Sequence, residues 1–222
     1  MAGRARRSMA KPIRGQSDSK DRQPRPLPLS GLRVTGGVRR GLKLEAPNDT
    51  RIRPTADRVR QAMFNLLSHR GQDGDIVRGA VILDAFAGTG ALGIEALSRG
   101  AKAATFLDTD QTALSLVSRN VAKAGMVDCT RTVLGDATRP PACTTPPATL
   151  LFLDPPYGLD LAAPALLALG RAGWVAANAH AVVEHDHADP VEPPASWDRV
   201  VNRRYGRVAI QLWRQTTSSE HQ

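Results

Sequence analysis

The chain has 222 residues and a mass of 23.8 kDa, which suits one ordinary domain with an additional segment and is too small for two full domains. Its net charge of +9 is unevenly spread, because residues 1–30 hold 8 basic and 2 acidic side chains, residues 31–70 hold 9 and 3, and residues 71–222 hold 13 and 16. This distribution excludes a protein that is basic throughout, and the basic first third favours a polyanionic partner such as nucleic acid.

The first 30 residues are rich in Gly, Ser, Pro and charge and have few apolar side chains. Such a segment cannot bury enough surface to offset the entropy lost on ordering, so we predict a disordered basic tail over residues 1–30. No apolar stretch follows the basic residues as it would in a signal peptide, and no apolar run approaches the roughly 20 residues that span a bilayer. We therefore expect a cytoplasmic protein without a membrane segment.

Residues 31–70 are predicted to form a small basic extension. Two short apolar stretches, Leu32–Thr35 and Leu42–Leu44, flank glycines and predict a β-hairpin. Pro54 then sits just before a predicted helix, with Thr55 as its N-cap. The apolar positions of that helix follow the helical period and are Val59, Ala62, Met63, Leu66 and Leu67.

Residues 71–214 show alternating strand and helix patterns and are predicted to form the main domain. The predicted strands are apolar along their length and are Val81–Ala85, Ala103–Leu107, Thr130–Leu134, Thr149–Leu153 and Ala179–Glu184. The predicted helices between them are Ala91–Ser98, Thr112–Ala124 and Leu161–Leu169. This alternation indicates an α/β fold with a mostly parallel sheet covered on both faces. Arg199–Arg204 and Arg207–Trp213 are predicted to add an antiparallel hairpin at one edge, before a flexible C-terminus over residues 215–222.

A glycine-rich loop follows the first predicted strand. Gly88, Gly90 and Gly93 form a GxGxxG, and Asp108 lies 20 residues after Gly88 at the end of the next strand. The pattern formally satisfies the dinucleotide fingerprint, which leaves a nicotinamide-dependent oxidoreductase open. Asp84, four residues before Gly88, argues against that cofactor, because a carboxylate repels a pyrophosphate and attracts the ammonium and sulfonium of S-adenosylmethionine. If Asp84 does not contact a cofactor, its role is to cap the turn.

The tetrapeptide Asp154-Pro155-Pro156-Tyr157 follows the fourth predicted strand, at the carboxyl edge where open α/β sheets bind ligands. Two prolines remove two backbone donors and leave carbonyls and a carboxylate as acceptors. Hydrogen bonds from an exocyclic amino group to these acceptors would direct the nitrogen lone pair towards a methyl donor, while the Tyr157 ring would stack on the base. The pattern favours methyl transfer to an amino group of a nucleobase.

Arg53–Leu67, the loop Asp84–Gly90 with Glu95–Ala101, and Asp154–Tyr157 together resemble the bacterial RsmD family over residues 31–214. That resemblance implies a Rossmann-like class I S-adenosylmethionine-dependent fold, a mostly parallel seven-stranded sheet with an antiparallel C-terminal hairpin. It also implies transfer of a methyl group to the exocyclic N2 of a guanine in 16S ribosomal RNA, guanine 966, by direct in-line displacement.

The resemblance assigns residues to two sides of a site. It implies that S-adenosylmethionine binds to Asp84, Phe86, Gly88 and Gly90, with Asp108 at its ribose hydroxyls and Asp136 and Ala137 beside its adenine. Implied for the target base are Asp154, Pro155, Pro156 and Tyr157. The family usually has Glu at the position of Asp108, so we expect the shorter side chain to need Asp110 or a water to complete the ribose contact.

The RNA contacts are expected from the basic extension, beside the catalytic edge. The candidate arginines are Arg33, Arg39, Arg40, Arg53, Arg58 and Arg60. We expect about half of the basic side chains there to touch RNA, since Arg58 or Arg60 could instead pair with Asp57. The partner is 16S ribosomal RNA, either free or within an assembling small subunit, and the protein is expected to be a monomer.

Neither cysteine, Cys129 nor Cys143, has a CxxC or Cys/His spacing, and the run His185-Asp186-His187 follows a predicted buried strand without a third cluster of ligands. We therefore predict no metal site and no disulfide framework. Two other functions stay open at this stage: a DNA adenine-N6 methyltransferase, because the Asp154–Tyr157 motif is shared with such enzymes, and a non-catalytic RNA-binding ribosome assembly factor.

Overall fold

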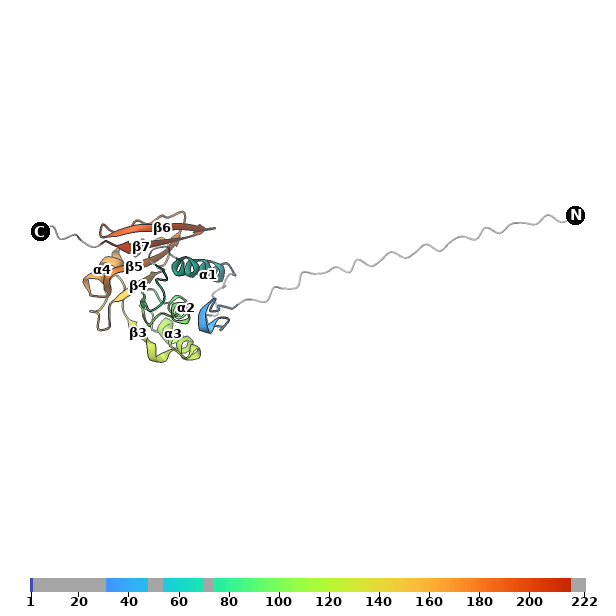
Figure 1. The fold of residues 1–222 in the computed structure, drawn as a ribbon, viewed down its shortest axis with the longest axis horizontal. Helices are drawn as coiled ribbons and strands as arrows, with labels where there is room; N and C mark the ends of the chain where they lie inside the picture. Colours follow the sequence, from blue (N-terminus) through green and yellow to red (C-terminus); the bar gives the residue numbers. More distant parts are fainter. Residues whose placement is uncertain (2–30, 48–53, 70–73, 217–222) are drawn as a thin grey trace.

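The computed structural model describes Met1 and residues 31–47, 54–69 and 74–216. A single seven-stranded sheet runs through the centre of these residues (Figure 1). The predictions for residues 2–30 of the tail, for Arg53 and for residues 217–222 lie outside the described residues, whereas Gln215, predicted to begin the flexible C-terminus, is the last residue of the final strand.

The strand order of the sheet is β3-β2-β1-β4-β5-β7-β6. The strands are β1 Val81–Asp84, β2 Ala103–Asp108, β3 Thr130–Leu134, β4 Ala148–Leu153, β5 Val175–Asp186, β6 Trp197–Tyr205 and β7 Val208–Gln215. Strands β1 to β5 pair in parallel, whereas β7 is antiparallel to both β5 and β6. The predicted fold class is therefore confirmed, including the antiparallel C-terminal hairpin.

The helices lie on both faces of the sheet. They are α1 Pro54–Ser68, α2 Ala91–Ser98, α3 Gln111–Ala124 and α4 Ala162–Arg171, with short 3-10 turns at Gly37–Arg39 and Val127–Cys129. Side chains alternate along a strand, so Leu150 and Phe152 pack in one cluster with α1, α2 and α3, whereas Leu151 and Leu153 pack in the other cluster with α4. Figure 1 shows α4 separated from the other three helices by the strands.

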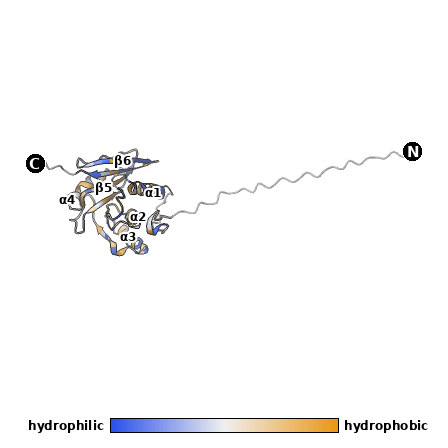
Figure 2. Cartoon of the chain, viewed as in Figure 1, coloured by the Kyte–Doolittle hydropathy of each residue, from blue (hydrophilic) through white to orange (hydrophobic). Residues whose placement is uncertain are grey.

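Hydrophobic residues concentrate in the central strands, while hydrophilic residues are prominent on the edge strand β6 (Figure 2). This contrast follows from position, because a central strand is covered on both faces and an edge strand is not. Among the described residues, no helix is both long and apolar enough to cross a membrane.

The predicted N-terminal hairpin forms as a short backbone ladder. Arg33 and Lys43 make an isolated antiparallel bridge, Val34 N donates to Leu42 O at 3.0 Å, and Leu44 N donates to Leu32 O at 2.8 Å. A 3-10 turn at Gly37–Arg39 closes it. The two stretches therefore pair as predicted in position, although only as an isolated bridge with flanking backbone bonds. Strand β5 is longer than its prediction over Ala179–Glu184 and continues to Asp186.

Candidate functional site

Three carboxylates from β1, β4 and β5 lie near one another at the carboxyl edge of the sheet. Asp84 is in register with Phe152, two residues before Asp154. Leu153 is in register with Val183, so Asp154 and Glu184 follow next on neighbouring parallel strands. The strand order thus brings together Asp84 and Asp154, which were predicted, and Glu184, which was not.

The Asp84 carboxylate is 1% exposed, and its Oδ2 accepts a hydrogen bond from Gly93 N at 3.0 Å. Burial raises the pKa of this carboxyl group to about 7, against the opposing effect of the Gly93 bond and with a smaller contribution from the charge of Asp108. The turn-capping role is therefore present in the structure. A cationic ligand at this edge would favour the ionised carboxylate.

The glycine loop takes left-handed backbone conformations, with φ of 52° at Gly88 and 74° at Gly90. A Cβ added to Gly88 would have only the Phe86 carbonyl oxygen near it, at 4.0 Å, whereas one added to Gly93 would lie 2.4 Å from the Phe106 ring. Gly88 thus leaves its backbone open to a ligand, while Gly93 allows α2 to approach β2.

Asp108 closes this loop from the neighbouring strand. Its Oδ2 accepts from Gly88 N at 2.8 Å, and its Oδ1 accepts from Asp110 N at 2.9 Å. The Asp110 side chain is occupied elsewhere, because its Oδ1 accepts from Thr112 N at 2.7 Å as the N-cap of α3. The geometry thus gives Asp110 a capping role, where the sequence suggested help with a ribose.

The residues expected beside the adenine follow β3. Asp136 is exposed, and its Oδ1 accepts from Thr138 N at 2.7 Å and from Thr138 Oγ1 at 2.8 Å. These bonds hold the pKa of the Asp136 carboxyl group below its usual value. Ala137 is buried in the hydrophobic cluster on the face of the sheet that α4 covers. Phe86 is partly buried and packs against the same cluster.

Pro155–Tyr157, which directly follow Asp154, line a surface pocket together with the end of β5. Its lining includes Pro155, Pro156, Tyr157, Glu184, His185 and Asp186. Tyr157 is 55% exposed. Its hydroxyl donates a hydrogen bond to Glu184 Oε1 at 3.2 Å. An accessible aromatic ring beside a carboxylate and a Pro-Pro backbone is suited to a flat, amino-bearing ligand.

The protonation of Asp154, Glu184 and Tyr157 is governed first by desolvation and, for Asp154 and Tyr157, then by the charges of neighbouring carboxylates. Asp154 as a whole is exposed, but the atoms around its carboxyl group exclude water from that group. This desolvation raises the pKa of the Asp154 carboxyl group, and the charges of Glu184 and Asp84 raise it further. Desolvation raises the pKa of Glu184 too, although its bond from Tyr157 and the charge of Arg60 oppose the shift. Desolvation and the charge of Glu184 raise the pKa of Tyr157, which therefore stays protonated as a donor.

The predicted RNA-contact arginines divide into two groups. Arg39, Arg40 and Arg58 are exposed and Arg33 is half-buried. Arg60 is 6% exposed, donates to Asp57 Oδ1 at 2.8 Å and also donates to the backbone carbonyl of Arg33. Its guanidinium thus binds inside the protein, so the pairing with Asp57 that the sequence left open is the one the structure has.

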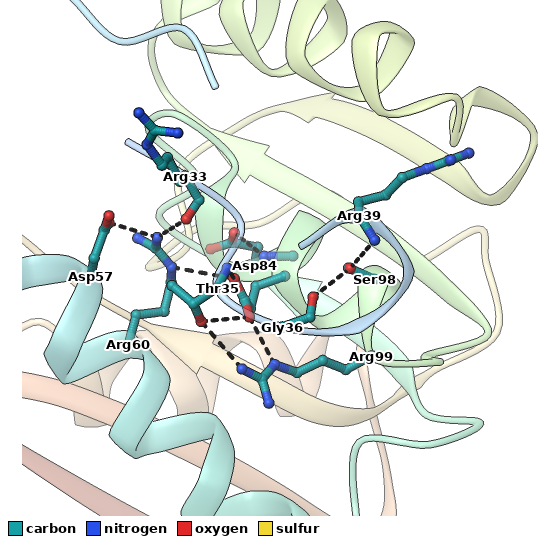
Figure 3. Close-up of polar contacts among 11 residues, drawn as sticks. Arg33, Thr35, Gly36, Arg39, Asp57, Arg60, Asp84, Ser98 and Arg99 are labelled. Carbon is teal, nitrogen blue, oxygen red and sulfur yellow. Dashed lines mark hydrogen bonds and ion pairs between the residues drawn. The ribbon is translucent and has the colours of Figure 1, made fainter. Parts of the chain in front are cut away.

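Arg60 belongs to a polar network that joins the extension to α2 (Figure 3). Glu95 is 0% exposed and accepts from Thr35 N at 2.6 Å, Thr35 Oγ1 at 2.8 Å and Arg99 Nε at 2.7 Å. Arg60 Nε lies 3.6 Å from Glu95 Oε2. Ser98 Oγ accepts from Arg39 N and donates to the Gly36 carbonyl. The basic hairpin is thereby fixed to the helix that follows the glycine loop.

The family model described as conserved hypothetical protein 95 matches residues 32–214. Ribosomal RNA small subunit methyltransferase D of Escherichia coli strain K12 is 35% identical over 192 residues, which are 85% of this chain and 92% of that protein. The protein of the same name from Haemophilus influenzae is 33% identical over 186 residues, 82% of this chain and 93% of its own. The solved structure of yhhF from Escherichia coli has a TM-score of 0.71 and 33% identity, covering 84% of this chain and 98% of that one.

Proposed function

The chain belongs to the RsmD family, and on that premise we propose that it is an S-adenosylmethionine-dependent methyltransferase of small-subunit ribosomal RNA. Its target is the exocyclic N2 of a guanine, guanine 966 of 16S RNA. The observation that carries the proposal is the juxtaposition of Asp84 and Asp154 at the ends of adjacent strands, with Tyr157 exposed next to them. One carboxylate would serve the cationic cofactor and the other the amino group.

S-adenosylmethionine, when bound, supplies an electrophilic methyl group on a sulfonium. The loop at Gly88, whose backbone is bound by the Asp108 carboxylate, would hold this cofactor. The Asp84 carboxylate would offset the positive charge of the cofactor. These residues fit the group because the Gly88 backbone is exposed and because, within the part of the chain that the structure describes, no cationic side chain pairs with the buried Asp84 carboxylate. Asp136 and Ala137 would border the adenine.

On the acceptor side, the Asp154 carboxylate and the Pro155 carbonyl would accept the two N–H groups of the guanine amino nitrogen. The nitrogen lone pair, otherwise delocalised into the ring, would then point towards the methyl group. Tyr157 would hold the base by stacking. The Asp154 carboxylate would take the proton that the amino nitrogen loses when it gains the methyl group. No covalent bond between enzyme and substrate is required.

The RNA would bind through arginines of the extension, the exposed Arg39, Arg40 and Arg58 and the half-buried Arg33, which lie on the part of the molecule joined to α2. Phosphate contacts of this kind position a substrate without reading its sequence. A ribosomal RNA substrate would place the protein in the cytoplasm, where it acts as a monomer on RNA that is free or in an assembling subunit.

Replacing Asp154 with Ala tests the acceptor side directly. We expect methyl transfer to 16S RNA to fall at least ~100-fold, because the amino group loses its charged acceptor, while S-adenosylhomocysteine binding measured by calorimetry stays close to wild type. Asp198→Ala, an exposed carboxylate on β6, serves as the matched control and should leave both measurements unchanged. The substrate is RNA from cells that lack this gene, and the methylated base is identified by mass spectrometry.

An Asp154→Ala enzyme with normal turnover would sink the mechanism. Methyl transfer by the wild type to adenine in DNA would establish the alternative substrate instead. Binding of NAD in preference to S-adenosylhomocysteine would overturn the role given to Asp84, and ribosomes impaired only by loss of the basic extension would favour a non-catalytic assembly factor.

A further inference from the structure

Glu184 has no role in the mechanism above, yet it lies next to the motif that would hold the base. It follows Val183, which is in register with Leu153, so its backbone lies level with that of Asp154 on the neighbouring strand. It also lines the same pocket as Pro155, Pro156 and Tyr157. A base held between Asp154 and Tyr157 would therefore meet the Glu184 carboxylate as well.

The contacts of Glu184 leave an acceptor available to a ligand. Its Oε1 accepts from the Tyr157 hydroxyl at 3.2 Å, and its Oε2 accepts no hydrogen bond from the part of the chain that the structure describes. The residue is half-buried rather than enclosed. The adjacent His185 is directed elsewhere, with Nδ1 beside the carbonyls of Asp186 and Asp189 and Nε2 beside Gln211.

The chemistry of this acceptor matches one purine better than the other. Guanine presents N1–H next to its 2-amino group, so two neighbouring positions of its Watson–Crick edge are donors. Adenine presents a lone pair at N1 next to its 6-amino group. Two neighbouring carboxylates can therefore accept both donors of guanine, whereas adenine would place its N1 lone pair against a negative charge.

We propose that Glu184 is the residue that selects guanine: its carboxylate accepts the N1–H of the target base while Asp154 and Pro155 accept the amino hydrogens. This inference rests on the proposed function. The bond from Tyr157 fixes the orientation of the carboxylate, so the group that stacks on the base also positions the group that identifies it. A site built around a particular hydrogen bond rejects a ligand that lacks the matching donor.

The test uses RNA in which the target guanine is replaced by 2-aminopurine, which keeps the 2-amino group but has a lone pair at N1. The wild type should methylate the guanine RNA at least ~100-fold faster than the 2-aminopurine RNA. Glu184→Gln should reduce this ratio at least ~10-fold, since a Gln amide either accepts from N1–H or donates to a bare N1. Glu192→Gln, an exposed glutamate beyond the pocket, should keep the wild-type ratio.

Two further variants separate recognition of guanine N1–H by Glu184 from the hydrogen bond that Glu184 makes with Tyr157. Tyr157→Phe removes the bond to Glu184 and should slow both substrates while preserving a preference for guanine. Glu184→Asp withdraws the carboxylate by one methylene and should slow methylation of the guanine RNA more than methylation of the 2-aminopurine RNA. This variant provides a second test of the proposal if Glu184→Gln does not fold. Circular dichroism and S-adenosylhomocysteine binding check the fold of each variant.

An unchanged ratio in folded Glu184→Gln, or a ratio lowered equally by Tyr157→Phe, would overturn the proposal. Either result would leave the proposed function intact if the wild type still methylates N2 of guanine. Failure of the wild type to methylate any guanine RNA would instead contradict the proposed function itself, so the two failures are distinguishable.

Discussion

At the scale of single residues, the carboxylate of Asp84 has a structural partner in Gly93 N and a pKa raised to about 7 by burial. In the unfolded chain this group ionises near 3.8. The folded protein therefore holds the proton more tightly, and the stability that the proton contributes is present below about pH 4 and is lost as the pH rises through 7. Asp154 and Glu184, whose pKa values are also raised, act in the same direction.

Replacing Asp84 with Asn should flatten the pH dependence of stability. The wild type without cofactor should lose up to about 4 kcal/mol through this group between about pH 4 and pH 8, and Asn keeps the acceptor for Gly93 N without a charge. Urea unfolding at several pH values measures the difference. Asp75→Asn, at a carboxylate outside the site, is the control, and a slope in Asp84→Asn equal to that of the wild type would contradict the assignment.

At the scale of elements, the hairpin and α1 are held against α2 by a buried carboxylate. Glu95 accepts from Thr35 and Arg99 with no solvent exposure of its own, and Arg60 lies close to it from α1. Removing one partner of a buried pair leaves an uncompensated charge, which costs more than the pair contributes. The position of the basic hairpin thus depends on a residue in the helix after the glycine loop.

Glu95→Gln should destabilise the protein by about 3 kcal/mol in denaturant unfolding and increase amide hydrogen exchange over residues 32–44. The matched control is Glu45→Gln, because Glu45 and Arg119 form an ion pair at 2.9 Å with both side chains about half exposed. Loss of this exposed ion pair in Glu45→Gln should lower the free energy of unfolding by less than about 1 kcal/mol. Equal unfolding free energies for the two variants would show that Glu95 does not hold the extension.

At the scale of the whole molecule, opposite charges occupy different parts of the chain. Residues 71–222 carry 16 acidic and 13 basic side chains, whereas residues 31–70 carry 3 and 9. Carboxylates gather at the edge proposed for a cationic cofactor and an amino group, while exposed arginines lie on the extension. This separation lets one surface bind phosphates without neutralising the carboxylates that the chemistry uses.

The basic tail should add affinity without adding specificity. Deleting residues 1–30, which hold 8 basic and 2 acidic side chains, should weaken RNA binding and reduce its dependence on salt, because fewer counterions are released. The methylated guanine should stay the same. Filter binding across a salt series and mapping of the modified base measure the two effects; a tail of equal length with Gln in place of Lys and Arg separates charge from length. A changed target would show that the tail takes part in selection.

The sequence by itself determined the order of strands and helices, the glycine loop and the motif Asp154–Tyr157, because these depend on local periodicity and on neighbours along the chain. Only the tertiary structure decided that Glu184 stands level with Asp154, that Arg60 turns inward, and that Asp108 fixes Gly88. The first and last of these join residues far apart in sequence and depend on which strands are neighbours in the sheet, an order that no local pattern encodes. Arg60 pairs with Asp57 three residues away, which the sequence offered as one possibility, but its bond to the Arg33 carbonyl depends on how the hairpin packs against α1.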